Sequence, residues 1–131
     1  MGLASTPASA PGSIPKIAIV SPPHTHALLS GEILDGNDVD FVARALSVGQ
    51  PHRAVPITVA LALAAAAKLE GSVVRSVMRA EGEAVDADGV TIGHASGRVL
   101  VSAGFDEDGM VRDAVIYRTA RRLMEGKVYY K

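Results

Sequence analysis

The sequence contains no cysteine and no tryptophan, and neither acidic nor basic residues dominate it. Without cysteine the chain can form no disulfide, carries no thiolate nucleophile and offers no sulfur ligand to a metal. The formal net charge is −1 and the isoelectric point is near 6.4, which argues against an electrostatic nucleic-acid binder, because such proteins need a basic face. Nothing points to secretion, so we expect a cytoplasmic protein with no nucleic-acid partner.

Long apolar runs are also missing. The run Val59–Ala67 falls far short of the roughly 20 apolar residues that cross a bilayer, and charged residues end it. No membrane partner is therefore expected. The first residues are rich in Ala, Ser, Pro and Gly and lack the basic start and apolar core of a signal peptide. We expect residues 1–13 to form a flexible lead-in and residues 14–131 to form a single domain.

The stretch "GQPHRAVPITVALALAAAAKLEG", residues 49–71, places the most apolar segment directly behind a basic loop that contains two prolines. Its Ala and Leu content favours helix over strand, and a helix that is apolar all round is expected to be buried all round. Either Thr58 caps this helix or Pro56 occupies its first position. In both cases free backbone N–H groups, which attract anions, lie beside His52 and Arg53. An ordinary capped core helix with a solvated Arg is the alternative to an anion site.

The rest of the chain predicts one more helix and several strands. The helix is expected over "LDGNDVDFVARALSVG", residues 34–49, where apolar residues recur at helical spacing and acids occupy the first turn. Strand patterns cover residues 14–20, 72–79, 110–120 and 127–131, and residues 90–105 predict two short strands around a turn. The predicted fold class is α+β, with a curled, mostly antiparallel sheet wrapped around one buried central helix.

Other polar clusters favour structural interpretations. His24 and His26 are two residues apart, so in an extended loop they point in opposite directions and suggest a surface loop rather than a metal site. Arg118, Arg121 and Arg122 could bind carboxylates, since guanidinium groups pair with them in a bidentate way, but a charged strand end is the more common explanation. The acidic turns "DADG" and "DEDG" do not match a calcium loop. We expect neither a metal nor a cofactor.

Several segments together carry a family resemblance. "PKIAIVSPP", "LSGE", "VDFVARALSVGQPHRAVPIT", "GHASGRVLV" and "YRTARRLMEG" follow one another in the order seen near the C-terminal end of the PrpF-like family. That family includes 2-methylaconitate cis–trans isomerase and 4-oxalomesaconate tautomerase, and it resembles diaminopimelate epimerase in fold. The resemblance implies that this chain is similar to the second of two halves, each a sheet wrapped around a central helix, with the active site in the cleft between them.

The resemblance also implies a chemistry. Family members move a proton between carbons of an unsaturated di- or tricarboxylate without metal or organic cofactor. Helix N-termini and fixed N–H donors suit the enolate-like charge of such a reaction, while a positioned base takes the proton. The family's acid and base, a Lys and a Cys, belong to the half that this chain is expected to lack. The resemblance therefore implies carboxylate binding rather than C–H bond cleavage by this chain alone.

Two segments of this chain match the family's substrate-binding loops. The residues carried over are His52, Arg53, Pro56, Ile57 and Thr58 before the helix, and His94, Ser96 and Gly97 in a later turn. Two positions depart from the family's pattern. Val59 stands where a Gly is usual and adds bulk at the helix start, and Ala95 replaces a Pro, which loosens the turn.

Three functions follow as hypotheses. The chain is a truncated isomerase domain that binds a small polycarboxylate, a non-catalytic assembly domain, or an isomerase that is active only as a dimer or with a partner chain. Because one half alone exposes apolar surface that a monomer normally avoids, we expect a homodimer or an association with the missing N-terminal half. His52 and His94 are the remaining candidates for a proton-transfer group.

Overall fold

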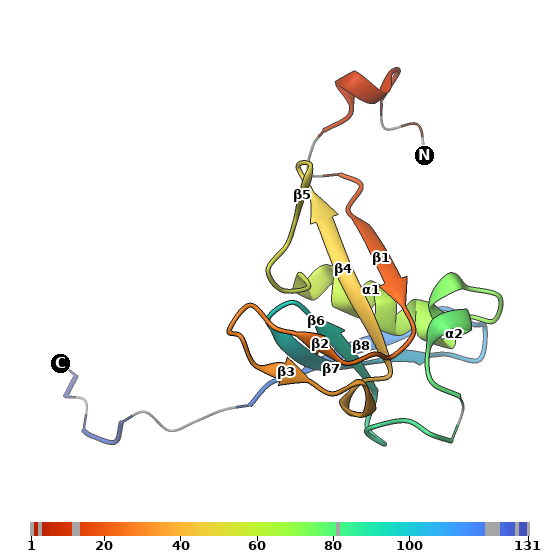
Figure 1. Cartoon of the computed structure of the whole chain (residues 1–131). Coiled ribbons are helices and arrows are strands. Elements are labelled where there is room, and N and C mark those ends of the chain that lie inside the picture. The colour runs from red at the N-terminus through yellow and green to blue at the C-terminus, as the bar shows by residue number, and fades with distance from the viewer. Residues whose placement is uncertain are drawn as a thin grey trace.

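The computed structural model describes residues 2, 4–11, 14–80, 82–119, 124–127 and 129–130 (Figure 1). A six-stranded sheet in the order β1-β4-β6-β7-β8, with β5 paired to β4, packs against one main helix, α1. The strands of this sheet are β1 (Ile17–Ser21), β4 (Phe41–Ser47), β5 (Gln50–Pro51), β6 (Val90–His94), β7 (Gly97–Phe105) and β8 (Val111–Tyr117). The other elements are β2 (His26–Ala27), β3 (Ile33–Leu34), α1 (Ile57–Lys68), α2 (Val73–Val77) and the 3-10 turns η1 (Pro7–Ser9) and η2 (Gly36–Asp38).

Every pair of neighbouring strands is antiparallel except one. β4 and β6 are parallel, with Phe41 opposite Ile92, and the chain between them forms α1 and α2. β6 and β7 form a tight hairpin in which His94 faces Gly97. The predicted fold class, a curled and mostly antiparallel α+β sheet around a central helix, is confirmed. So are the strands near residues 14–20, 90–105 and 110–120.

The core lies between α1 and the inner face of the sheet. Ala60, Leu63, Ala64 and Ala67 are the buried residues of α1. They belong to one cluster with buried side chains of three strands, namely Phe41, Ala43, Val90, Ile92, Val101 and Ala103. Alanines on the buried stripe let the helix approach the strands closely, which fixes the position of its first turn relative to the sheet.

One side of α1 is open, contrary to the expectation that it would be buried all round. Ala62 is exposed and Ile57 is 49% exposed. The physical reason is that the sheet does not close. β1 and β8 are its two edges, and no strand among the described residues joins them across the helix.

A shallow apolar depression follows this open side. We call it the β1–α1 groove; it has a volume of about 430 Å³. Its walls are Lys16 and Ala18 at β1 and Thr58, Val59, Ala62, Leu63 and Ala66 on α1. The groove separates the helix from an unpaired strand edge, so both are accessible from the same side.

The helix predicted over residues 34–49 is wrong, because the apolar part of that segment is β4 and the part before it contains only the end of β3 and the 3-10 turn η2. Phe41 and Ala43 pack into the core with α1, whereas Val42 between them packs with Leu34 on the opposite face. A strand buried on both faces is apolar at nearly every position. Such a run also contains apolar residues at helical spacing, which is why the pattern was misleading.

Two further strand predictions fail. Residues 72–79 contain the short helix α2, which begins where the Ser72 side chain accepts a hydrogen bond from the Arg75 backbone N–H (3.0 Å). At the other end of the chain, Lys127, Tyr129 and Tyr130 form no strand, and the rest of the segment 127–131 lies outside the described residues. The predicted division at residue 13 stays a prediction.

A buried carboxyl group ties the loop before β6 to β4. Asp40 is 0% exposed. Its side chain accepts hydrogen bonds from the backbone N–H groups of Val85 (3.0 Å) and Thr91 (2.6 Å), and its backbone carbonyl accepts one from Arg79 (2.9 Å). These contacts fix the segment between α2 and β6 to the start of β4.

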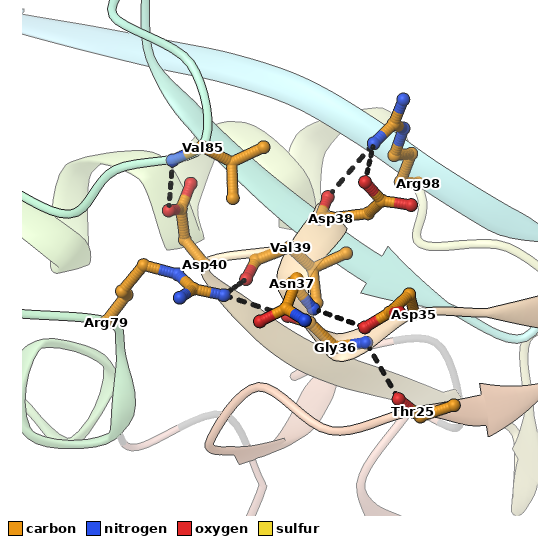
Figure 2. A network of polar contacts seen from close by, with 10 residues as sticks. All are labelled: Thr25, Asp35, Gly36, Asn37, Asp38, Val39, Asp40, Arg79, Val85 and Arg98. Carbon is orange, nitrogen blue, oxygen red and sulfur yellow. Dashed lines mark hydrogen bonds and ion pairs between the residues drawn. The ribbon is translucent and has the colours of Figure 1, made fainter.

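The Arg79 side chain extends the same connection to η2. Its guanidinium donates hydrogen bonds to the carbonyl oxygens of Gly36 (2.9 Å) and Val39 (3.2 Å), and Figure 2 shows it lying beside Asp40 within this cluster. We call Asp40, Arg79 and the backbone groups that they bind the Asp40 network. It holds three chain segments together through buried and part-buried hydrogen bonds, although the Nε atom of Arg79 is buried without a hydrogen-bond partner.

Candidate carboxylate-binding site

A cavity of about 770 Å³ lies at the start of α1 and the adjoining ends of β6, β7 and β8. We call it the α1 cavity. Its lining includes Ala54, Val55 and Ile57 at the helix start, and Thr91, His94, Ser96, Arg98, Val99, Leu100, Ile116, Tyr117 and Arg118 on the sheet. This volume lies within the range of about 300–1,000 Å³ that is usual for small-molecule sites.

The cavity has walls from both faces of the sheet. Val99 and Ile116 pack toward the core with α1. Their neighbours Leu100 and Tyr117 are paired with each other and, because side chains alternate along a strand, point to the opposite face. The cavity therefore curves around the end of the β7–β8 pair, and only its inner part faces the helix.

The first turn of α1 presents unpaired backbone donors. Pro56 is the N-cap residue and provides no side-chain cap. Both predicted alternatives are therefore wrong, since Thr58 does not cap the helix and the first helical position is Ile57 rather than Pro56. The first helical hydrogen bond joins the Ala60 N–H to the Pro56 carbonyl (2.9 Å). The N–H groups of Ile57, Thr58 and Val59 consequently lack an intrahelical acceptor. Such groups, with the helix dipole, favour a bound anion.

The two predicted binding segments meet at this helix end. The Ser96 hydroxyl in the β6–β7 turn donates a hydrogen bond to the carbonyl oxygen of Arg53 in the loop before α1 (2.6 Å). The same turn is anchored on its other side, where the Leu29 N–H donates to the Ala95 carbonyl (2.8 Å). The sheet hairpin and the helix-leading loop are thus held as one rim.

His94 has a defined proton position. Its Nδ1 accepts a hydrogen bond from the Ser96 backbone N–H (3.1 Å), which requires a neutral ring with the proton on Nε2. Burial lowers the pKa of His94 below its ordinary value, and the nearby charges of Arg44 and His26 lower it further. At neutral pH the ring therefore offers one N–H donor and carries no charge.

The predicted site residues divide into distinct groups. Ile57, His94 and Ser96 line the α1 cavity. Thr58 instead lines the β1–α1 groove beside Val59, so the extra bulk of Val59 lies in the groove and not among the residues of the cavity wall.

The remaining predicted residues do not line the cavity. Arg53 is exposed and reaches the rim through its backbone carbonyl. The Nε2 atom of His52 is buried without a hydrogen-bond partner. Gly97 has a φ of 136° at the end of the hairpin turn, in a region that L side chains rarely adopt, and Pro56 acts as the N-cap. Their roles as direct ligands stay predictions.

Sequence reasoning missed part of the wall. Thr91, Arg98 and Tyr117 line the cavity but were not among the predicted site residues. Arg98 makes an ion pair with Asp38 (3.4 Å), which Figure 2 includes. The signal was the strand period, since polar residues alternate with apolar ones at the ends of the two strands that flank the hairpin turn.

The part of the chain that the structure describes contains neither a cluster of metal ligands nor a helix that could cross a membrane. No group of three or more His, Asp or Glu side chains there is placed to hold a metal ion. None of the described helices has the length and apolar character needed to span a membrane.

The architecture defines a class of protein: an α+β unit whose sheet curls around one helix, with the helix N-terminus open to a ligand-sized cavity. The family model described as PrpF protein matches residues 1–131. The chain belongs to the PrpF family.

Related proteins agree with this assignment. The chain is 37% identical over 118 residues to 3-methylitaconate isomerase of Eubacterium barkeri, covering 89% of this chain and 30% of that protein. It is 42% identical over 117 residues to 2-methyl-aconitate isomerase of Shewanella oneidensis, covering 87% of this chain and 28% of that protein. The crystal structure of methylitaconate-delta-isomerase matches with a TM-score of 0.72 at 36% identity, over 89% of this chain and 30% of that one. The chain thus spans about 30% of the length of these relatives.

Proposed function

We propose that this chain supplies the carboxylate-binding part of a PrpF-type isomerase and holds a small di- or tricarboxylate at the start of α1. The observation that carries the proposal is the uncapped first turn of the helix at a ligand-sized cavity. An anionic carboxylate would accept a hydrogen bond from the free N–H of Ile57, the residue of the first helical turn that lines the cavity. The relatives with which the chain shares its fold are named as isomerases of methylitaconate and methylaconitate.

The chemistry that this chain can offer is stabilisation of negative charge. A proton removed from a carbon beside a carboxylate or alkene leaves an enolate-like anion, and fixed donors lower its free energy. The Nε2–H of neutral His94 and the helix N–H groups are such donors. A base for proton removal is the missing component, because the sequence has no cysteine and the unprotonated Nδ1 of His94, the proton-transfer candidate in the cavity wall, already accepts a hydrogen bond from the Ser96 N–H. We propose that a second polypeptide segment supplies it.

Titration of the ¹⁵N-labelled chain with trans-aconitate tests the binding. The amide signals of Thr58 and Ser96 are expected to shift together and to saturate, while the amide of Ser76 on α2 serves as an internal control. A parallel assay follows proton exchange into a methylaconitate. Saturable shifts without exchange support binding alone, and exchange that is abolished in His52→Ala would establish catalysis by the isolated chain. Absence of any saturable shift would refute the proposed carboxylate site.

A second candidate function is assembly, because one edge of the sheet is unprotected. Ile17 and Ile19 of β1 are each 61% exposed, and no charged residue interrupts Ile17–Ser21. Apolar edge strands of this kind pair readily with another chain, and the adjacent β1–α1 groove offers more apolar surface for burial. We propose that a second copy of the chain pairs along this edge to give a homodimer.

Sedimentation velocity at micromolar concentration tests the dimer. Ile19→Lys places a charge in the edge strand and is expected to yield a monomer. Ile33→Lys is the matched control, because Ile33 is 66% exposed but belongs to the small β2–β3 pair. A monomeric parent chain, or an equal effect of the two substitutions, would contradict the proposal.

A further inference from the structure

A guanidinium without a partner faces the α1 cavity. Arg118 follows the last residue of β8 and lines the cavity with His94, Ser96 and Ile57. Its side chain is exposed. None of the hydrogen bonds or ion pairs found among the described residues involves this side chain, so its charge is available to a bound molecule.

The other charged groups of the cavity wall form contacts within the protein. Arg98 also lines the cavity, but it donates to the Asp38 carbonyl (3.2 Å) and pairs with the Asp38 carboxylate (3.4 Å). Asp86 is the acidic residue of the lining, and its Oδ1 accepts a hydrogen bond from the Asp88 N–H (2.9 Å). Arg118 is therefore the arginine of the described wall that makes no ion pair, and the Asp86 carboxylate keeps its charge without pairing to either arginine of the wall.

The cavity thus contains two separate features that attract anions. One is the uncapped start of α1, and the other is Arg118 beyond the end of β8, on a different element of the fold. A ligand with a single carboxylate can use only one of them. A ligand with two carboxylates has one group for each feature, and the planar guanidinium suits bidentate pairing with the second one.

We propose that Arg118 binds the second carboxylate of the substrate and makes the site selective for dicarboxylates over monocarboxylates. This inference rests on the proposed function, which places the first carboxylate at the start of α1. Arg118 is a specificity-determining residue in this arrangement. It contacts the end of the ligand that does not accept hydrogen bonds from the helix.

Fumarate and crotonate form a matched pair of probes, since a methyl group in crotonate replaces one carboxylate of fumarate. Affinities are measured by calorimetry or by amide shifts at neutral pH and low salt. The parent chain is expected to bind fumarate about tenfold more tightly than crotonate, the equivalent of one additional charge-assisted contact. Arg118→Gln is expected to remove this preference and to leave crotonate binding unchanged. Arg118→Lys is expected to restore part of it.

Arg112→Gln is the control for a general charge effect. Arg112 lies on β8, the strand that Arg118 follows, but its side chain pairs with Asp113 (2.7 Å), and it does not line the cavity. Arg112→Gln is expected to keep the tenfold preference. A preference that survives in Arg118→Gln, or that falls equally in both variants, would overturn the role of Arg118 while leaving the proposed function intact. Failure of the parent chain to bind either probe would overturn both proposals.

Discussion

The Asp40 network and the α1 cavity are two polar regions of one small fold, and they use their polar groups in opposite ways. In the network, both oxygens of a fully buried carboxyl group accept hydrogen bonds from backbone N–H groups. In the cavity, the backbone donors of the first helical turn and the guanidinium of Arg118 have no partner in the described chain.

This difference separates scaffold from binding site. Buried polar groups contribute to stability where they are paired, as both Asp40 carboxylate oxygens are, because an unpaired group retains its desolvation cost. Donors that face an open cavity remain hydrated in the free protein and exchange water for a ligand. Substitutions in the network should therefore lower stability, and substitutions in the cavity should change binding and leave stability nearly unaffected.

The largest effect is expected for Asp40→Ala. The substitution leaves the N–H groups of Val85 and Thr91 buried without acceptors, and a loss of about 3 kcal/mol in the free energy of unfolding is expected. Urea denaturation measures it. Asp113→Ala is the control, because Asp113 is exposed and should change stability by no more than about 0.5 kcal/mol. Equal losses in the two variants would show that the network is not a scaffold.

The sequence predicted the scaffold only in part. The alanine-rich helix and the hairpin strands were found because composition and turn residues agree with their environment. β4 was predicted as a helix because burial on both faces removes the alternation that marks a strand. α2 was predicted as a strand because Val73, Val74 and Val77 favour β structure locally, whereas its helical form depends on the Ser72 cap and on packing of Val74.

Ser96→Ala is expected to have an intermediate effect, since Ser96 lines the α1 cavity and its side chain also joins two chain segments. Its hydroxyl ties the hairpin turn to the loop before α1 (2.6 Å), so the variant should lose about 1 kcal/mol of stability. The same substitution removes the contact that holds the rim of the cavity together. The free energy of trans-aconitate binding should therefore fall by more than the free energy of unfolding. Ser102→Ala, on β7 away from the turn, controls for loss of a hydroxyl. An unaltered affinity for trans-aconitate would remove the turn from the proposed site.

The candidate site was predictable to the extent that its parts are local. The loop before α1 and the β6–β7 turn each carry sequence signals, and the Ser96–Arg53 contact joins them. Arg118 was given a structural interpretation, because its place in the same cavity wall as Ile57 and His94 depends on how the sheet packs beside α1. Local periodicity carries no information about such contacts.

A smaller effect is expected from the pH dependence of stability at His94. Because its pKa in the folded chain lies below 6.5, the unfolded chain binds the proton more readily than the folded one. The contribution of neutral His94 to the free energy of unfolding is therefore fully present above about pH 6.5. It is lost as the pH falls from there toward the lower pKa that His94 has in the folded chain. Urea midpoints at pH 7.5 and 5.5 measure the change. His94→Asn should show a smaller loss between these values, with the other histidines unchanged, and an identical loss would contradict the assignment.

The smallest change in stability is expected for Arg118→Gln. This variant therefore gives the sharpest test of the contrast between the α1 cavity and the Asp40 network. The side chain is exposed and forms no hydrogen bond or ion pair among the described residues, so removing its charge should alter the free energy of unfolding by less than about 0.5 kcal/mol. If the fumarate preference disappears at the same time, the residue acts on the ligand and not on the fold. A clear loss of stability would instead mean that Arg118 is part of the scaffold, and the contrast between the cavity and the Asp40 network would fail at this position.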